Sequence, residues 1–340
     1  MEVREFEGPG REWDTFVERQ DGWTHMHLIG WRQVLSDVLG HDCPYLAARR
    51  GGELRGVLPL VSVRSFVFGK YLVSMPFLNY GGPLGDPDAV AALVGAASEM
   101  AISTGVDLLE LRSRRELPID LPDSGRKITV TLPLLPGAPD ALWNRFTSKL
   151  RTKIRRSAKE GIEVRFGPDQ IAAYFEVFRR HMRDLGTPTL PRRLFETIGS
   201  VFPESCWFAA AYFEGRPIAA GCALLWGTEI EMTWSAGLQE FNRLRPNMWL
   251  YWSVMERACR EGLETFNFGR CSPGSGTHAF KSSWTGATDE RLFWYFLSSS
   301  DRSSTPTPDS PGLALGPRVW KRVPLPVATA LGPSIVRFIP

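Results

Sequence analysis

An internal duplication is the feature of this sequence that most constrains its fold. Residues 45–60 read as a strand, a tight turn at Gly51-Gly52 and a second strand, and residues 207–224 repeat this pattern around Gly215. A helical segment that ends in glycine and leads into an apolar strand also occurs twice, at residues 90–111 and at residues 249–268. Corresponding positions lie about 160 residues apart. The pattern predicts tandem duplicated α/β domains, each with a central mixed sheet flanked by helices.

Chain length and linker composition suggest where these domains end. A chain of 340 residues can form two domains of about 150 residues each. The proline-rich stretch 132–139 predicts the divide, so we expect an N-terminal domain over residues 1–135 and a C-terminal domain over residues 136–297. Residues 298–340 read as a flexible Ser/Thr/Pro linker followed by a basic and apolar tail. We expect this tail to pack on the body or to contact a membrane surface.

Composition excludes several classes of protein. There is no secretory leader pattern and no run of about 18 apolar residues, so we expect a cytoplasmic protein without a transmembrane segment. The five cysteines are far apart and form no Cys-x-x-Cys pair, which argues against a disulfide framework and against a metal site. The five histidines are too scattered to predict a Ser/His/Asp triad, and Gly274-x-Gly276 lacks the third glycine of a dinucleotide fingerprint.

Seven cations and no acid stand between residues 145 and 159. An apolar residue recurs every fourth position from Leu142 to Ala158, which predicts an amphipathic helix whose other faces are basic. One interpretation is an ordinary solvated face. The other is a contact for RNA phosphates or for an anionic nucleotide-linked acceptor, because within residues 145–159 no acid stands at the stabilising three- and four-residue spacings. The residues predicted to contact RNA or another anion are Lys149, Arg151, Lys153, Arg155 and Arg156.

Residues 266–281 read as a strand that leads into a glycine-rich turn. Phe266 and Phe268 alternate with Asn267, as in a strand with one buried face. Glycines at 269, 274 and 276 let a ligand approach the backbone where a Cβ would clash. Arg270 and Lys281 place positive charge at the two ends of the turn. This arrangement is typical of the floor of an acyl-transfer site.

The segment and its surroundings resemble the Fem-type, peptidoglycan bridge-forming aminoacyltransferases, which are double copies of the GNAT acyltransferase fold. They are most similar to the branch of that family associated with exosortase and exopolysaccharide gene sets. The resemblance spans nearly the whole chain, and the matching residues are 56–60, 79–83, 247–252, 266–270, 272–276, 280–281 and 320–326. It implies an N-acyltransferase that moves an amino acid from aminoacyl-tRNA to an amine of a lipid-linked or nucleotide-linked precursor of the cell envelope or of a polysaccharide. Such an enzyme would work in the cytoplasm, at the inner face of the membrane, with the acyl donor as a co-substrate and no tightly bound cofactor.

The resemblance also implies roles for individual residues. Lys281 would stabilise the charge that develops on the carbonyl oxygen, and Phe280 would shape the site. The second domain would carry this chemistry, and the first would help to bind the acceptor. Asn267 stands where the family often has Asp, which leaves the general base unassigned. Residues implied to bind substrate are Asn79, Tyr80, Arg243, Arg245, Asn247, Arg270, Gly274 and Gly276.

Several of these residues have structural interpretations as well. Arg270 fits either a phosphate or carboxylate contact or an internal salt bridge, and Asn247 fits either a ligand contact or a helix cap. Cys271 in the turn is better read as a small residue than as a nucleophile, and His278 falls where relatives often have Tyr.

Two other functions compete with tRNA-dependent transfer. In coenzyme A-dependent GNAT enzymes the turn before the helix carries an Arg/Gln-x-x-Gly-x-Gly/Ala pattern that holds the pyrophosphate. Residues 237–247 lack its glycine pair, although Arg243 and Arg245 lie beside the expected helix start at Pro246. An acyl-CoA-dependent N-acyltransferase of exopolysaccharide amino sugars is therefore the alternative enzyme. A non-catalytic binding module with the same fold is the alternative from another class.

Overall fold

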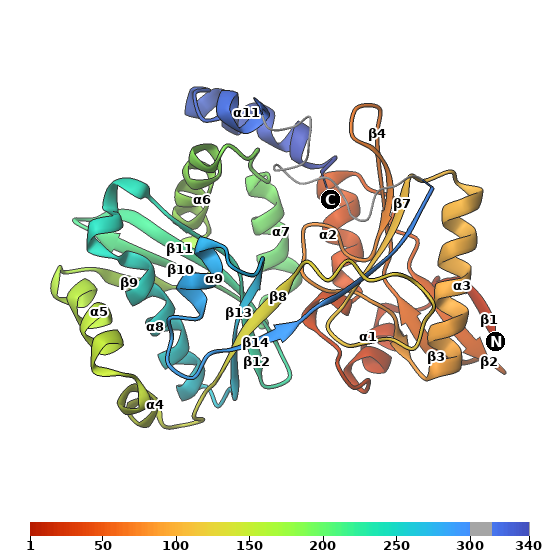
Figure 1. Cartoon of the computed structure of the whole chain (residues 1–340), viewed down its shortest axis with the longest axis horizontal. Helices are drawn as coiled ribbons and strands as arrows, with labels where there is room; N and C mark the ends of the chain where they lie inside the picture. The colour runs from red at the N-terminus through yellow and green to blue at the C-terminus, as the bar shows by residue number, and fades with distance from the viewer. Residues whose placement is uncertain (300–314, 340) are drawn as a thin grey trace. The chain divides into compact units, whose positions relative to one another are not determined.

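The computed structural model describes residues 1–299 and 315–339 (Figure 1). The chain separates into two units. The first comprises Met1–Lys127 with the described residues of 291–310 and the residues from Ser334 onward. The second comprises Ile128–Glu290 with the described residues of 311–333.

The two units share a core order of elements, which confirms the predicted duplication. The first unit holds β1(Glu2–Glu5), α1(Gly10–Glu18), α2(Gly30–Leu39), β2(Leu46–Arg50), β3(Glu53–Leu58), β4(Val61–Ser65), β5(Gly69–Val73), β6(Leu84–Gly85), α3(Pro87–Ser103), β7(Leu108–Ser113) and β15(Phe293–Ser298). The second unit holds β8(Ile128–Pro133), α4(Pro139–Arg145), α5(Ser148–Lys159), β9(Glu163–Phe166), α6(Ile171–Leu185), α7(Arg192–Val201), β10(Cys206–Phe213), β11(Arg216–Trp226), β12(Glu229–Gly237), α8(Pro246–Arg260), β13(Thr265–Cys271), α9(Gly276–Lys281) and β14(Thr288–Arg291). In each unit two helices precede an antiparallel hairpin, and a crossover helix joins two parallel strands.

The parallel pairs define the equivalence of the units. α3 joins β5 to β7, and α8 joins β12 to β13, as a parallel connection requires. Both helices end before a glycine with positive φ, at Gly105 and Gly262, which stand 157 residues apart. The second unit has one sheet, of order β14-β8-β13-β12-β11-β10-β9. The first has two, β1-β2-β3-β6 and β15-β7-β5-β4, because Pro59 separates β3 from β4 and a proline cannot donate to a ladder.

Two strands each pair with a strand from the other half of the sequence. β8 follows the first repeat in sequence but pairs antiparallel with β13, and β15 follows the second repeat but pairs antiparallel with β7. The division at residues 127 and 128 therefore differs from the predicted boundary at 135, because the start of the proline-rich stretch is part of β8. Residues 291–297, which we expected in the C-terminal domain, belong to the first unit for the same reason.

The cores show why small residues recur at particular places. In the first unit α3 packs on β3, where an added Cβ at Gly56 would lie 2.8 Å from Ala89 Cβ. In the second unit the core is built around α8, whose Leu250, Val254 and Met255 are buried against the sheet. The buried face of α8 therefore fixes this helix over β11 and β12.

The basic segment forms two helices instead of the single predicted one. α4 ends before Phe146, whose backbone is extended, and Thr147 caps α5 by accepting a hydrogen bond from the Leu150 amide. Leu142, Phe146 and Leu150 are nevertheless buried together, so the apolar stripe was read correctly and the break within it was missed.

The tail contains α10(Leu315–Trp320) and α11(Leu325–Val336). α11 packs on the second unit: Arg179 donates to Thr329 Oγ1 at 3.3 Å, and Gly332 lies against Thr189. Most of the predicted linker, residues 300–314, lies outside the described residues. Within the described part of the chain, no helix is both long enough and apolar enough to span a bilayer.

Candidate active site

The predicted strand of the site, β13, lies in the middle of the second unit's sheet. We expected one buried face, but Phe266, Asn267 and Phe268 are all at most 1% exposed. The reason is that β13 lies between β8 and β12, with aromatic side chains packed against Phe266 and Phe268. The ladder between β12 and β13 ends at Glu231 and Asn267, although both strands continue beyond these residues.

Asn267 holds three strands together. Its Nδ2 donates to Glu229 Oε1 at 2.7 Å, and its Oδ1 accepts from Thr129 Oγ1 at 2.6 Å and from the Gly269 amide at 2.8 Å. A carboxylate could accept the last two bonds but could not donate to Glu229. The amide at this position, where the resemblance implies Asp, therefore has a structural reason.

Lys281 is buried at the end of α9, a short helix that the sequence analysis missed. The side chain is 4% exposed, and its Nζ donates to the carbonyls of Gly269 at 2.6 Å and Arg270 at 2.9 Å. Burial lowers its pKa to about 8, while Cys271 and Glu231 act in the opposite direction. An ammonium has three N–H donors, so these two acceptors leave one for a further partner. Lys281 is therefore a cation fixed at the end of β13 and not a surface lysine.

An aromatic cluster connects α9 with α8. The ring of Phe280 lies edge-on to Tyr251 with centroids 5.1 Å apart, and Tyr251 stacks on Phe268 at 5.7 Å. The hydroxyl of Tyr251 lies 2.8 Å from Ser235 Oγ on β12, and burial raises the pKa of this tyrosine to about 12. Tyr251 is not among the residues predicted from the sequence. The sequence signal that could have indicated this tyrosine is its position four residues after Asn247, on the same face of α8.

The predicted phosphate contacts lie immediately before and at the start of α8. Arg243 and Arg245 are exposed, and Arg245 adopts positive φ where the helix begins. Asn247 lies against Gly237, where an added Cβ would be 2.9 Å from Nδ2, and its buried Oδ1 has no hydrogen-bond partner among the described residues. The Arg245 side chain does not cap α8, whereas Asp86 caps the equivalent helix α3 of the first unit. The start of α8 therefore favours an anion more than the start of α3 does.

The basic face of α5 is joined to this end of α8. The buried hydroxyl of Ser157 lies 2.8 Å from the carbonyls of both Leu244 and Arg245, which share its single proton. Among the described residues, no acid lies within ion-pair distance of the seven cations between 145 and 159. Arginines of other helices of this unit do have acidic partners, such as Arg180 with Glu176 and Arg260 with Glu256.

The rest of the glycine-rich turn is internally bonded. The Gly274 amide donates to His278 Nδ1 at 3.0 Å, so Nε2 carries the proton and donates to Asp289 at 2.8 Å. Ser275 caps α9 by accepting from the His278 amide. The turn thus brings Ser, His and Asp together, but the ring nitrogen that would act as a base is already occupied. Gly276 is the first residue of α9 and has open space around it.

The remaining predicted residues have different surroundings. Arg270 is half-buried on β13, opposite Thr129 of β8. Cys271 is buried and forms no disulfide, which fits the small-residue interpretation. No cluster of metal-ligating side chains occurs in the described parts of the chain.

Asn79 and Tyr80 lie in the first unit, and both are buried. Their loop is held by a buried ion pair: Arg112 contacts Glu110 at 2.8 Å and also donates to the carbonyls of Met75 and Leu78. The next loop residues, Gly82 and Pro83, line a cavity of about 270 Å³, whereas the two predicted side chains do not.

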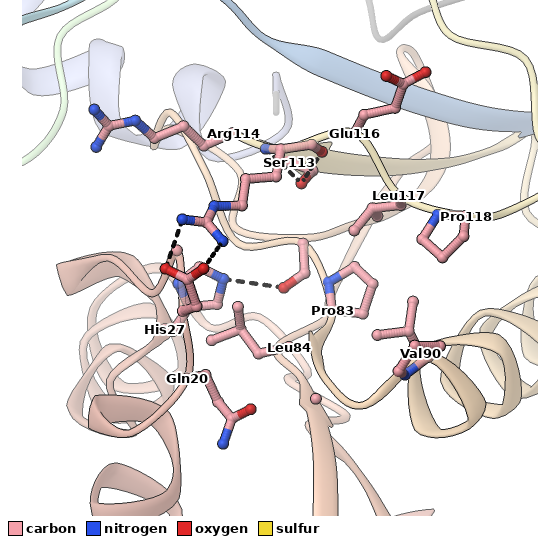
Figure 2. A pocket seen from close by; sticks show the side chains of 16 residues that line it. Gln20, His27, Pro83, Leu84, Val90, Ser113, Arg114, Glu116, Leu117 and Pro118 are labelled. Atoms are coloured by element: carbon pink, nitrogen blue, oxygen red, sulfur yellow. Dashed lines mark hydrogen bonds and ion pairs between the residues drawn. The ribbon is translucent and has the colours of Figure 1, made fainter.

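Figure 2 shows this cavity, which the sequence analysis did not locate. The Thr24 amide donates to His27 Nδ1, so His27 Nε2 donates to the Gly82 carbonyl at 3.0 Å. Burial lowers the pKa of His27 to about 4, so this histidine is a neutral support for the loop and not a base. Gln20 and Glu116 are among the polar lining residues, and Arg115 pairs with Asp21.

Comparison with known proteins identifies the second unit. Residues 144–282 match the family model of the acetyltransferase (GNAT) domain. The protein carries a GNAT domain and is an acyltransferase. None of the curated proteins matches the chain at a significant level.

Solved structures extend the likeness to both units of this chain. FemX has a TM-score of 0.65 at 16% identity, over 87% of this chain and 98% of that one. The C-terminal domain of a putative lysylphosphatidylglycerol synthetase from Agrobacterium fabrum has a TM-score of 0.56 at 14% identity, over 86% and 92%. A tandem GNAT protein from the clavulanic acid biosynthesis pathway has a TM-score of 0.51 at 11% identity, over 86% and 93%. Identities this low show the fold alone, and the fold is the predicted tandem GNAT arrangement.

Proposed function

We propose that this protein is an N-acyltransferase that moves an amino acid from aminoacyl-tRNA to an amine of a cell-envelope or polysaccharide precursor. The observation that carries the proposal is the basic face of α5, which has no acidic partner among the described residues and is fixed by Ser157 to the loop before α8. RNA presents a regular array of phosphates that such a face can neutralise. The likeness to FemX, at the level of the fold, agrees with this proposal. The exosortase-associated branch of the family stays a prediction.

Lys281 supplies the chemistry in this proposal. When the acceptor amine attacks the ester carbonyl of the donor, a C–N bond forms and negative charge develops on the carbonyl oxygen. The Lys281 donor that Gly269 and Arg270 leave available stabilises that charge, which is worth about 3 kcal/mol in a site that excludes water. The C–O bond then breaks, and the ribose oxygen takes up a proton. Burial of Lys281, which is 4% exposed, excludes water from the ammonium, and Phe280, packed edge-on against Tyr251, would shape the site.

The first unit would receive the acceptor. Its cavity has space for a small polar group and lies beside the loop that the family resemblance assigns to the acceptor side. A lipid-linked acceptor would place the enzyme at the inner face of the membrane.

Acyl-CoA-dependent transfer to an amino sugar is the second candidate. It is favoured by the acetyltransferase model that matches residues 144–282 and by Arg243 and Arg245 at the start of α8. These two cations suit a pyrophosphate, but the glycine pair of the usual pattern is missing.

Binding of charged tRNA and of acetyl-coenzyme A, each at two salt concentrations, separates the candidates. The triple variant R151E/R155E/R156E should weaken tRNA binding more than tenfold and lower the slope of log affinity against log salt by about 2 to 3. The double variant R192E/R260E is the control, because it reverses two exposed arginines of the same unit that already have acidic partners. Binding of acetyl-coenzyme A alone would overturn the tRNA proposal.

A further inference from the structure

We infer that the turn between β4 and β5 docks on the surface of an anionic lipid bilayer. Phe66 and Val67 form the tip of this hairpin, and their exposed fractions are 112% and 83%. In Figure 1 the turn projects beyond the other elements of its own unit. These are the two most exposed large apolar side chains among the described residues. Water-exposed turns usually carry polar residues, so the fold gives no reason for this pair.

The turn is organised before it meets a partner. Ser65 Oγ accepts hydrogen bonds from the amides of both Val67 and Phe68 at 3.1 Å. The flanking strands are paired in register from Val61 with Val73 to Ser65 with Gly69. The two apolar side chains are therefore held outward by a fixed backbone, which reduces the entropy lost on binding.

Positive charge stands directly behind the apolar tip. Arg64 and Lys70 are cross-strand partners, and both are exposed. Two like charges in this position destabilise a hairpin, so their presence is explained by a contact outside the hairpin. Arg64 Nε donates to Ser62 Oγ, and the nearby acid Asp107 accepts from the main-chain amide of Lys70. No ion pair to either cation occurs in the described parts of the chain.

An apolar tip with cations behind it complements the two layers of a bilayer surface. Phe66 and Val67 would enter the boundary of the acyl chains, while Arg64 and Lys70 would remain at the level of the anionic headgroups. A protein partner fits less well, because a stable protein interface buries about 800 Å² on each side and a hairpin tip offers far less. This inference does not depend on the identity of the acyl donor. It adds to the proposed function the place where a lipid-linked acceptor would be met.

Sedimentation with lipid vesicles tests the inference on the full chain. We expect the protein to bind phosphatidylcholine vesicles that contain phosphatidylglycerol, and to bind them less as salt rises. F66S/V67S should weaken this binding at least tenfold, and R64E/K70E should weaken it by about fivefold for each cation. I102S is the matched control, because Ile102 is 74% exposed on α3 of the same unit and lacks the cationic setting. Its binding should equal that of the wild type.

A reporter at the tip gives an independent measurement. The emission of F66W should shift to the blue on addition of the anionic vesicles and should be quenched by brominated acyl chains. Three results would overturn the inference: no binding to anionic vesicles, equal binding to neutral vesicles, or binding that F66S/V67S leaves intact. The last would point to another surface, such as Val319, Val327 and Leu331 of α10 and α11. Binding of tRNA and coenzyme A in the absence of lipid should be unchanged in F66S/V67S, so failure here is distinguishable from failure of the proposed function.

Discussion

Replacing Lys281 by methionine should separate its catalytic value from its effect on stability. Methionine has a similar length but cannot donate to the carbonyls of Gly269 and Arg270. The wild-type ammonium has a pKa of about 8 in the folded state, against an ordinary value of 10.5. Burial of the charge therefore costs about 3 kcal/mol at pH 7.5. Loss of the two hydrogen bonds costs about as much, so K281M should change the free energy of unfolding at this pH only slightly.

The pH dependence reveals the buried charge. Between pH 8 and pH 10.5 the unfolded chain binds more protons at Lys281 than the folded chain does, so wild-type stability rises with pH across this window. The cost is present in full below pH 8 and disappears as the pH approaches 10.5. The wild type should therefore gain about 2 kcal/mol over K281M between pH 7.5 and pH 10.

Urea denaturation at the two pH values, followed by tryptophan fluorescence, measures this difference. K149M, which removes an exposed lysine of α5, is the control and should remain parallel to the wild type. Turnover of K281M at pH 7.5 should fall by about a hundredfold to a thousandfold. If the stabilities of the wild type and K281M change equally with pH, the ammonium is not buried as described. If turnover is retained, Lys281 does not stabilise the reacting carbonyl.

Two further substitutions test the strand that carries the site and its counterpart in the first unit. N267D should destabilise the fold by about 2 kcal/mol at pH 7, because the new carboxylate faces Glu229 and cannot donate to it. The new acid's pKa should lie above its ordinary value, so the loss should shrink towards pH 4; a deficit that stays constant with pH in urea denaturation would contradict this reasoning. R112M should cost about 3–5 kcal/mol, because it removes the guanidinium from the buried carboxylate of Glu110. The double variant R112M/E110L should recover much of that loss, and a cost for R112M below about 1 kcal/mol would show that the pair is not buried together.

The sequence predicted the repeated parts of the fold because their signals are local. The turn glycines at 51, 52 and 215 have positive φ, as the hairpin assignment requires. The glycines after α3 and α8 do so as well, and both helices lie where the pattern put them. Lys281 and Phe280 were also found together at one end of β13, because they are adjacent in sequence and follow a recognisable strand and turn.

Features that depend on distant contacts were missed. The pairing of β8 with β13 brings Thr129 to Asn267, and no local pattern shows that the polar face of this strand is covered. The cavity of the first unit is lined by residues between Gln20 and Pro118, which only the folded chain brings together. Glu110 and Asn267 are also 157 residues apart, and they pair with equivalent positions of β5 and β12. Glu110 forms a buried ion pair with Arg112, whereas the neutral amide of Asn267 forms a hydrogen-bond network. The repeat pattern predicts that these two positions are equivalent, but it does not predict that their contacts differ.

The pairing of β15 with β7 can form only late in the synthesis of the chain. β7 is complete at Ser113, but its partner begins at Phe293, so the ribosome adds 179 residues between the two strands. At about 5 to 20 residues per second this takes about 9 to 36 seconds, during which one edge of β7 lacks its final partner. An uncovered, apolar strand edge is prone to pair with other chains. During this interval the nascent protein therefore depends on chaperones, or on its own later residues, to cover the free edge of β7. In a chain shortened before residue 293 that edge would never receive its final partner.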